Sequence, residues 1–249
     1  MSEKWPHLSK APITEAIIDF QFADTENIEF DNIKSLEEIL VKDFPEIQPK
    51  RISKITTMIS PAGPVTEISD EGFHGIVCSS EDNIKVIQIL TDRFALSYLK
   101  PYSNWIEFES DVLGYWQIVQ KKLSISALKR IGVRFINKIE MDLPVLDFND
   151  YFRSIPQIDP ELPQSLLGFH QQFAFQFPDK NSLAIVALNF ENIDQTKQVA
   201  NMLLDIDVGY TGLMDTGAAR LKKILSELRD YKNLIFYKMI TQKVVEKYI

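Results

Sequence analysis

Residues 130–142 read RIGVRFINKIEMD, and their side chains alternate between two kinds along most of this stretch. A period of two residues is typical of a strand with one buried face and one polar face. Ile136 and Asn137 break the alternation. The apolar positions are Ile131, Val133, Phe135, Ile139 and Met141, and the others are Arg130, Gly132, Arg134, Lys138 and Glu140. We therefore predict a long strand at the centre of the fold.

The chain before this strand predicts a strand, a helix, a meander and a second helix. Ile13–Phe22 alternates like Arg130–Asp142, and Asp31–Phe44 has the apolar spacing of a helix that stops before Pro45. The second helix is expected at Trp105–Lys122, with Asn104 as its N-cap. The meander would consist of Ile52–Ser60, Val65–Ile68, Phe73–Ser79, Ile84–Leu90 and Phe94–Leu99.

The chain after the central strand has a similar order of elements. A short helix is expected at Phe148–Ile155, followed by a proline-rich loop at Pro156–Pro163. A long helix should begin between Asp215 and Ala218, and Thr241 should cap a final turn. The strands between would be Phe169–Phe177, Leu183–Phe190 and Met202–Tyr210. The order of elements thus divides the chain into two units, residues 1–126 and 127–249, although the two show no convincing sequence identity.

This duplicated order resembles the saddle fold of the TATA-box-binding protein and its relatives. The resemblance implies an α+β protein in which two βαβββα-type pseudo-repeats form one extended, curved antiparallel sheet, with long helices packed on one face. The first strands of the two repeats would pair across a pseudo-twofold axis. In this chain, that pairing would bring Glu15 and Asp19 opposite Arg130 and Arg134.

Composition limits the classes of function. The chain has 249 residues, 45% of them hydrophobic, which is enough to bury a sizeable core. No run of eighteen apolar residues and no signal-peptide pattern is found, so we expect a cytoplasmic protein without membrane contact. The net charge of −8 disfavours nucleic-acid binding, because a negatively charged protein repels phosphate backbones. Cys78 is the one cysteine, which excludes an internal disulfide.

Motifs for catalysis or cofactors are missing from the sequence. It contains no phosphate-binding loop, no glycine-rich dinucleotide turn and no nucleophile elbow. His7, His74 and His170 are far apart, and none has a second ligand at metal-binding spacing. We therefore predict no catalytic residue, no cofactor and no metal site, and we favour a protein that is not an enzyme.

The leading hypothesis is a soluble binding module that uses the open polar face of the sheet. The candidate residues on this face are Arg130, Arg134, Lys138, Asp205 and Asp207. Asp205 and Asp207 are two residues apart on a predicted strand, so both carboxylates lie on one face, where they would share a cation or pair with the arginines. The partner would be a protein or a small molecule, and exposed edge strands leave homodimerisation open.

Two alternative functions follow from other residues. Tyr98, Tyr102 and Trp105 surround the junction of a hairpin and a helix, where they would line a small-molecule pocket or belong to the core. A pocket would suit a small-molecule binder or an enzyme. Nucleic-acid binding by the saddle would need a basic concave face, which an acidic chain disfavours.

Several stretches together resemble a family of sporadically distributed bacterial and archaeal proteins of about this length. They are Gln88–Trp105 (QILTDRFALSYLKPYSNW), Arg130–Ile139 (RIGVRFINKI), Leu204–Val208 (LDIDV), residues 11–20 (APITEAIIDF) and Phe236–Thr241. These motifs have the character of strands and turns, so the resemblance implies no particular activity. The scattered occurrence of the family suggests accessory proteins of mobile or defence-type loci.

Overall fold

The computed structural model describes residues 5–26, 28–60, 63–145, 147–156, 158–159, 161–162 and 168–249, and for 53–60 and 64–71 it describes the backbone without side-chain environments. Within these residues the chain forms helices and a single antiparallel sheet of nine strands, which confirms the predicted α+β class. None of the described helices combines the length and the apolar character needed to cross a membrane.

The two strands at the centre of the sheet are β1 (Ile13–Phe22) and β6 (Ala127–Asp142). The strand order is β2-β3-β4-β5-β1-β6-β9-β8-β7, so each central strand has the last strand of the following meander as its outer neighbour. The remaining strands are β2 (Glu46–Ser60), β3 (Gly63–Ser79), β4 (Lys85–Leu90), β5 (Arg93–Leu99), β7 (His170–Gln176), β8 (Ser182–Asp194) and β9 (Val199–Asp215).

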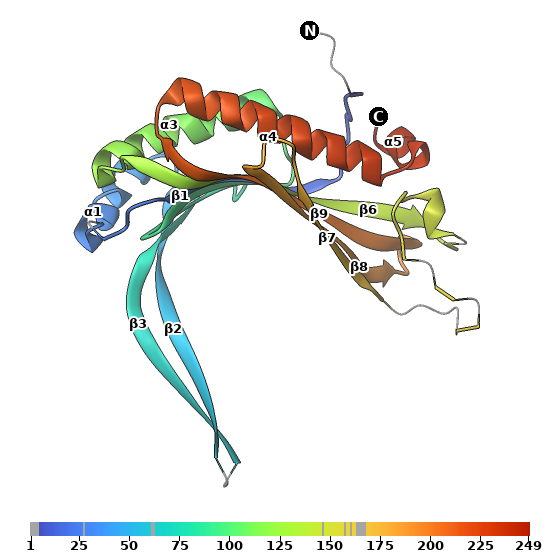
Figure 1. Ribbon diagram of the computed structural model, residues 1–249, viewed down its shortest axis with the longest axis horizontal. Coiled ribbons are helices and arrows are strands. Elements are labelled where there is room, and N and C mark those ends of the chain that lie inside the picture. Colours follow the sequence, from blue (N-terminus) through green and yellow to red (C-terminus); the bar gives the residue numbers. More distant parts are fainter. Residues whose placement is uncertain are drawn as a thin grey trace.

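Helices α3 (Trp105–Leu123) and α4 (Ala218–Met239) cover one face of the sheet. Figure 1 shows that the sheet bends into an arch, with these helices on its convex side and with the β2–β3 ribbon extending away from one end. We call the opposite side of the sheet the concave face. The shorter helical segments are α1 (Phe30–Lys34), α2 (Glu37–Leu40), η1 (Phe148–Asp150) and α5 (Gln242–Tyr248).

The central pairing has the register that places apolar side chains under the helices. Strands β1 and β6 are antiparallel, with Ile18 opposite Val133 and Phe20 opposite Ile131, and all four side chains are fully buried. Trp116 of α3 lies edge-on to Phe20, with ring centroids 5.0 Å apart. Burial of such aromatic and aliphatic side chains is the main force that holds the helices on the sheet.

Asn137, which interrupts the alternation of β6, faces the helices. Its side chain is 2% exposed, and its amide nitrogen donates to the carbonyl oxygen of Leu204 at 3.0 Å and to that of Phe135 at 3.2 Å. A buried amide is tolerated where its donors find acceptors. Asn137 therefore occupies a core position without disrupting the strand.

Several predicted boundaries were wrong. The single helix expected at Asp31–Phe44 is two short helices, α1 and α2, because Ser35 ends the first one, and its hydroxyl donates to the carbonyl oxygen of Asn32 at 2.8 Å. The separate strands expected at Val65–Ile68 and Phe73–Ser79 belong to the continuous β3, in which Gly72 adopts a φ of +100°. The helix expected at Phe148–Ile155 shrinks to η1. Parts of the predicted loop Pro156–Pro163 lie outside the described residues.

Candidate binding face of the sheet

Arg130 lies at the centre of the concave face and joins three strands. Its guanidinium donates to Asp19 of β1 through Nη1 and to Asp207 of β9 through Nη2, each at 2.6 Å. The three side chains are only 15–30% exposed, so water weakens these ion pairs little. The predicted pairing of β1 with the basic side of β6 is therefore confirmed for Asp19 and Arg130.

Burial and charge act in opposite directions on this triad. Burial disfavours the cation, but the carboxylates of Asp19 and Asp207 outweigh it and raise the pKa of Arg130. Burial also raises the pKa of Asp207, and the nearby guanidinium offsets this only in part. The second carboxylate oxygen of Asp19, Oδ2, is buried and has no hydrogen-bond partner among the described residues. Formation of the triad therefore costs free energy, because one guanidinium and two carboxylates are removed from water.

Two glycines form the floor on which the guanidinium of Arg130 rests. Gly132 of β6 is paired with Gly209 of β9. A Cβ atom on Gly132 would lie 2.1 Å from Oδ1 of Asp19 and 2.2 Å from Nη1 of Arg130, and one on Gly209 would lie 2.7 Å from Nε of Arg130. Sequence reasoning missed this role, although glycine inside a predicted strand is itself a sign of close approach.

Arg134 occupies the next position along the same face. Its Nε and Nη2 donate to the two carboxylate oxygens of Asp205 at 2.9 and 2.6 Å, the forked geometry that arginine forms with carboxylates. The hydrogen bonds that Arg134 donates to Asp205 outweigh burial and raise the pKa of Arg134. Asp205 and Asp207 therefore pair with different arginines and do not share a cation.

Two further residues of this face were considered in the sequence. Lys138 pairs with Glu191 of β8 at 2.8 Å, one strand beyond the candidate aspartates. Glu15 lies opposite Ile136 in the β1–β6 register, and in the described part of the chain it makes no ion pair with Arg134. Arg134 pairs directly with Asp205 of β9 and not with Glu15, although the charge of Glu15 is near enough to contribute to the raised pKa of Arg134.

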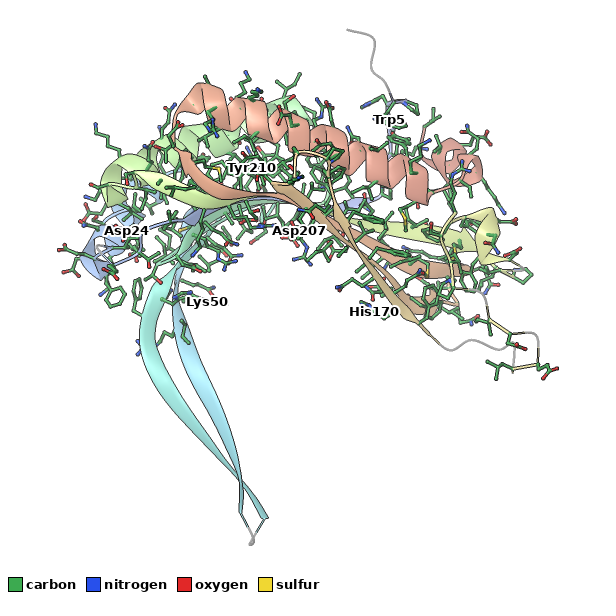
Figure 2. All side chains as sticks on the ribbon, viewed as in Figure 1. Trp5, Asp24, Lys50, His170, Asp207 and Tyr210 are labelled. Atoms are coloured by element: carbon green, nitrogen blue, oxygen red, sulfur yellow. The ribbon has the colours of Figure 1, made fainter. Side chains whose placement is uncertain are left out.

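Apolar side chains surround this charged centre. Ile17, Ile136 and Leu203 point to the concave face and are partly buried, whereas Leu183 and Ile185 of β8 are 41% and 40% exposed. Figure 2 shows Asp207 near the middle of the arch, between Lys50 at the base of the β2–β3 ribbon and His170 on β7. The concave face thus combines a charged centre with exposed aliphatic positions.

The aromatic alternative lies on the other side of the sheet. Tyr98 is 1% exposed, and its hydroxyl donates to Asp111 at 2.5 Å, where Lys85 also binds at 2.7 Å. Burial, and then the hydrogen bond to Asp111, raises the pKa of Tyr98. Tyr102 lies 6.4 Å from Tyr98 between ring centroids. These contacts are those of an aromatic core.

Trp105 is the member of the aromatic set that reaches a groove. It is 8% exposed, and its ring is nearly parallel to that of Phe135 at 6.5 Å between centroids. A groove of about 630 Å³ between α3 and α4 is lined by Trp105 and Arg229, among other residues. Tyr98 and Tyr102 are not among the residues that line it.

Two further observations bear on the site: the search for metal-binding groups and the comparison with known proteins. Over the residues that the structure describes, no group of three or more His, Cys, Asp or Glu side chains is arranged to hold a metal ion. The family resemblance of the motifs remains a prediction. No protein-family model matches this chain, and no curated protein matches it significantly.

Proposed function

We propose that this protein is a binding module that holds a polypeptide partner on its concave face. The observation that carries the proposal is a sheet face that none of the described helices covers, on which ordered arginine–carboxylate pairs lie beside the exposed Leu183 and Ile185. Arginine and aliphatic side chains around a partly desolvated centre are typical of protein interfaces. Arg134 is 43% exposed, so the part of its guanidinium that faces away from Asp205 is accessible to a partner.

The charge on this face favours a polypeptide over a nucleic acid. Arg130 and Arg134 are matched by Asp19, Asp205 and Asp207, and Lys138 is matched by Glu191. A polyanion gains most where cations are free to replace its counterions. Cations already bound to carboxylates offer little of that gain, whereas a partner of mixed charge can extend the existing pairs.

We also propose that residues 1–126 and 127–249 are two pseudo-repeats of one saddle, as in the TATA-box-binding protein. The strand order supports this, since β1 lies beside β5, β6 lies beside β9, and β1 and β6 pair with each other. A long helix follows each meander, α3 in the first half and α4 in the second. The concave face would then be the common surface of both repeats.

Site-specific photocrosslinking tests the proposed face. A photoreactive residue at Ile185, on the concave face, should give a discrete adduct with a polypeptide in an extract of the native host. The matched control carries the same group at Lys238, exposed on α4. An adduct from Ile185 that excess unlabelled protein removes would support the proposal. Equal adducts from both positions, or none from Ile185, would contradict it.

A charge swap tests whether the arginine–carboxylate pattern takes part. Exchanging the partners in the double variant Arg134→Asp/Asp205→Arg keeps an ion pair at this place and reverses its direction. We expect the variant to fold, to compete at least tenfold less well for the Ile185 adduct, and to keep the circular dichroism spectrum of the unmodified protein. Undiminished competition by the folded variant would remove these residues from the interface.

A further inference from the structure

Two cations of α4 face aromatic rings on the helix side of the sheet. The Nζ atom of Lys232 lies 4.0 Å from the centroid of the Phe135 ring, and the guanidinium carbon of Arg229 lies 5.5 Å from that of the Trp105 ring. Tyr102 completes the surroundings, with its ring 5.5 Å from that of Phe135. Rings attract cations through their electron-rich faces, but they do not neutralise the charge.

No carboxylate is paired with either cation among the residues that the structure describes. The acidic side chains nearest to the aromatic rings belong to α3 and have other contacts. Glu109 accepts a hydrogen bond from Nε1 of Trp105 at 3.2 Å, and Glu107 lies 3.8 Å from Lys85. Arg229 and Lys232, one helical turn apart, are therefore two neighbouring cations without an ion-pair partner among the described residues.

The charge state of Lys232 agrees with this geometry. Burial, and then the neighbouring charge of Arg229, lowers the pKa of Lys232 to about 7. The other titratable group beside it is Tyr102, from the loop before α3, whose ring contacts the Phe135 ring under Lys232. Glu109 of α3 lies farther along the groove, at Trp105. Burial raises the pKa of Tyr102, so this side chain stays neutral near physiological pH. An anion bound at the site would supply the negative counter-charge that Lys232 lacks.

The groove between α3 and α4 gives access to this site. Its lining includes Trp105 and Arg229, and it continues along α4 past Ser226 and Lys222. Two carboxylates, Glu109 of α3 and Glu227 of α4, also line it. The volume of about 630 Å³ is in the range of small-molecule sites, although this groove is open to solvent. One end therefore presents the Trp105 ring beside Arg229, with Lys232 one helical turn farther along α4 and outside the lining, and the remainder of the groove has room for the body of a ligand.

We propose that Arg229, assisted by the charge of Lys232 one helical turn away, binds the carboxylate of a small organic anion whose flat apolar part lies against Trp105 in the α3–α4 groove. Arginine binds carboxylates through its forked donors, and lysine adds a point charge. The aromatic wall selects ligands that carry a ring or another planar group. This site lies on the opposite side of the sheet from the concave face, so it stands independently of the proposed polypeptide partner.

Binding of such an anion is coupled to a proton. Below pH 7 Lys232 is charged before the ligand arrives, so binding takes up no proton. Above pH 7 the free amine must be protonated as the anion binds, and the affinity should fall about tenfold for each pH unit. Simple pairing with a permanently charged arginine has no such dependence in this range, because arginine does not titrate there.

Calorimetry with indole-3-acetate as the probe tests the site, with acetate and sulfate as simpler anions. At pH 8.5, titrations in two buffers of different ionisation enthalpy should reveal uptake approaching one proton, and at pH 6 almost none. Indole-3-acetate should bind at least tenfold more tightly than acetate. Equal affinity for all three anions would reject the aromatic wall, and the absence of saturable binding would reject the site.

Two variants and a control assign the effect to the cations. Lys232→Met should abolish the proton uptake and weaken binding, while Arg229→Gln should weaken binding at least tenfold and retain the uptake. Lys238→Ala, on an exposed part of α4 outside the groove, should change neither quantity. Proton uptake that persists in Lys232→Met would overturn the assignment, and undiminished affinity in Arg229→Gln would overturn the proposed carboxylate contact.

Discussion

The two groups of cations differ in how their charge is balanced. On the concave face, Arg130 and Arg134 contact carboxylates at 2.6–2.9 Å. On the helix side, Arg229 and Lys232 contact aromatic rings and have no carboxylate partner in the described residues. The first arrangement raises the pKa of its arginines and the second lowers the pKa of its lysine.

Arg130 and Arg134 are therefore cations that support the fold, whereas Arg229 and Lys232 are cations without an ion-pair partner in the described residues. A buried cation costs free energy unless an anion accompanies it, and a protein that retains such a cost gains something from it elsewhere. Arg130 brings three strands together, so its removal should affect stability most. Lys232 destabilises the protein as long as the site is empty, so its replacement should raise the free energy of unfolding.

The largest expected loss of stability is that of Arg130→Met. The substitution leaves two carboxylates, Asp19 and Asp207, without a cation in a mostly buried place, and it should lower the free energy of unfolding by about 3 kcal/mol. Urea denaturation followed by circular dichroism measures this. Arg134→Met, at a more exposed pair, should cost clearly less. Equal losses in the two variants would show that burial does not distinguish the two arginines.

The glycine floor gives the second effect. Gly132→Ala should lower the free energy of unfolding by about 1–3 kcal/mol, because its Cβ would overlap both partners of the Asp19–Arg130 pair. Gly114→Ala in α3 is the matched control, since nothing lies within 4 Å of the place that the added methyl group would occupy, and it should stabilise the protein by about 0.5–1 kcal/mol. Stabilisation of both variants would contradict the close approach of Arg130 and Asp19 to Gly132.

The pH dependence of stability isolates Lys232. Its pKa is about 7 in the folded protein and near 10.4 when unfolded, so between these values the unfolded chain binds more protons and stability rises with pH. The slope from this group is at most about 1.4 kcal/mol per pH unit. Lys232→Met should be more stable than the unmodified protein at pH 7, and the difference should shrink toward pH 9.5. Urea denaturation at several pH values measures it, and a constant difference would contradict the lowered pKa.

The smallest effect is expected at Lys138. Its pair with Glu191 is about one-third exposed on both sides, and exposed pairs contribute at most about 1 kcal/mol. Lys138→Ala should therefore change the free energy of unfolding by less than this amount, as read from the urea midpoint. A loss as large as that of Arg130→Met would mean that the whole row of β6 cations acts as one unit.

The sequence predicted the two central strands of the sheet and the contact between Asp19 and Arg130. It could do so because alternation along Ile13–Phe22 and Arg130–Asp142 reports directly which side chains are buried. It also predicted Asn104 as the N-cap of α3, where its side chain accepts from the amide of Glu107 at 2.9 Å. Such signals are local, so a single strand or turn contains them.

What the sequence did not predict depends on contacts between distant residues. Arg134 could not be assigned to Asp205 or to Glu15 without the register of three strands. The Gly132–Gly209 floor required the same register. In the sequence, Lys232 is one basic residue among many on its helix, and its contact with the Phe135 ring becomes visible only in the packed structure.

The triad of Asp19, Arg130 and Asp207 has a consequence for how the chain is made. Asp19 and Arg130 are 111 residues apart, so β1 leaves the ribosome long before its central partner is synthesised. During that interval β1 can pair with β5 but has an open second edge and an unmatched acidic side chain. Completion of β6 closes this edge and supplies Arg130 at one step, and β9 adds Asp207 later, which ties the maturation of the first half to the arrival of the second.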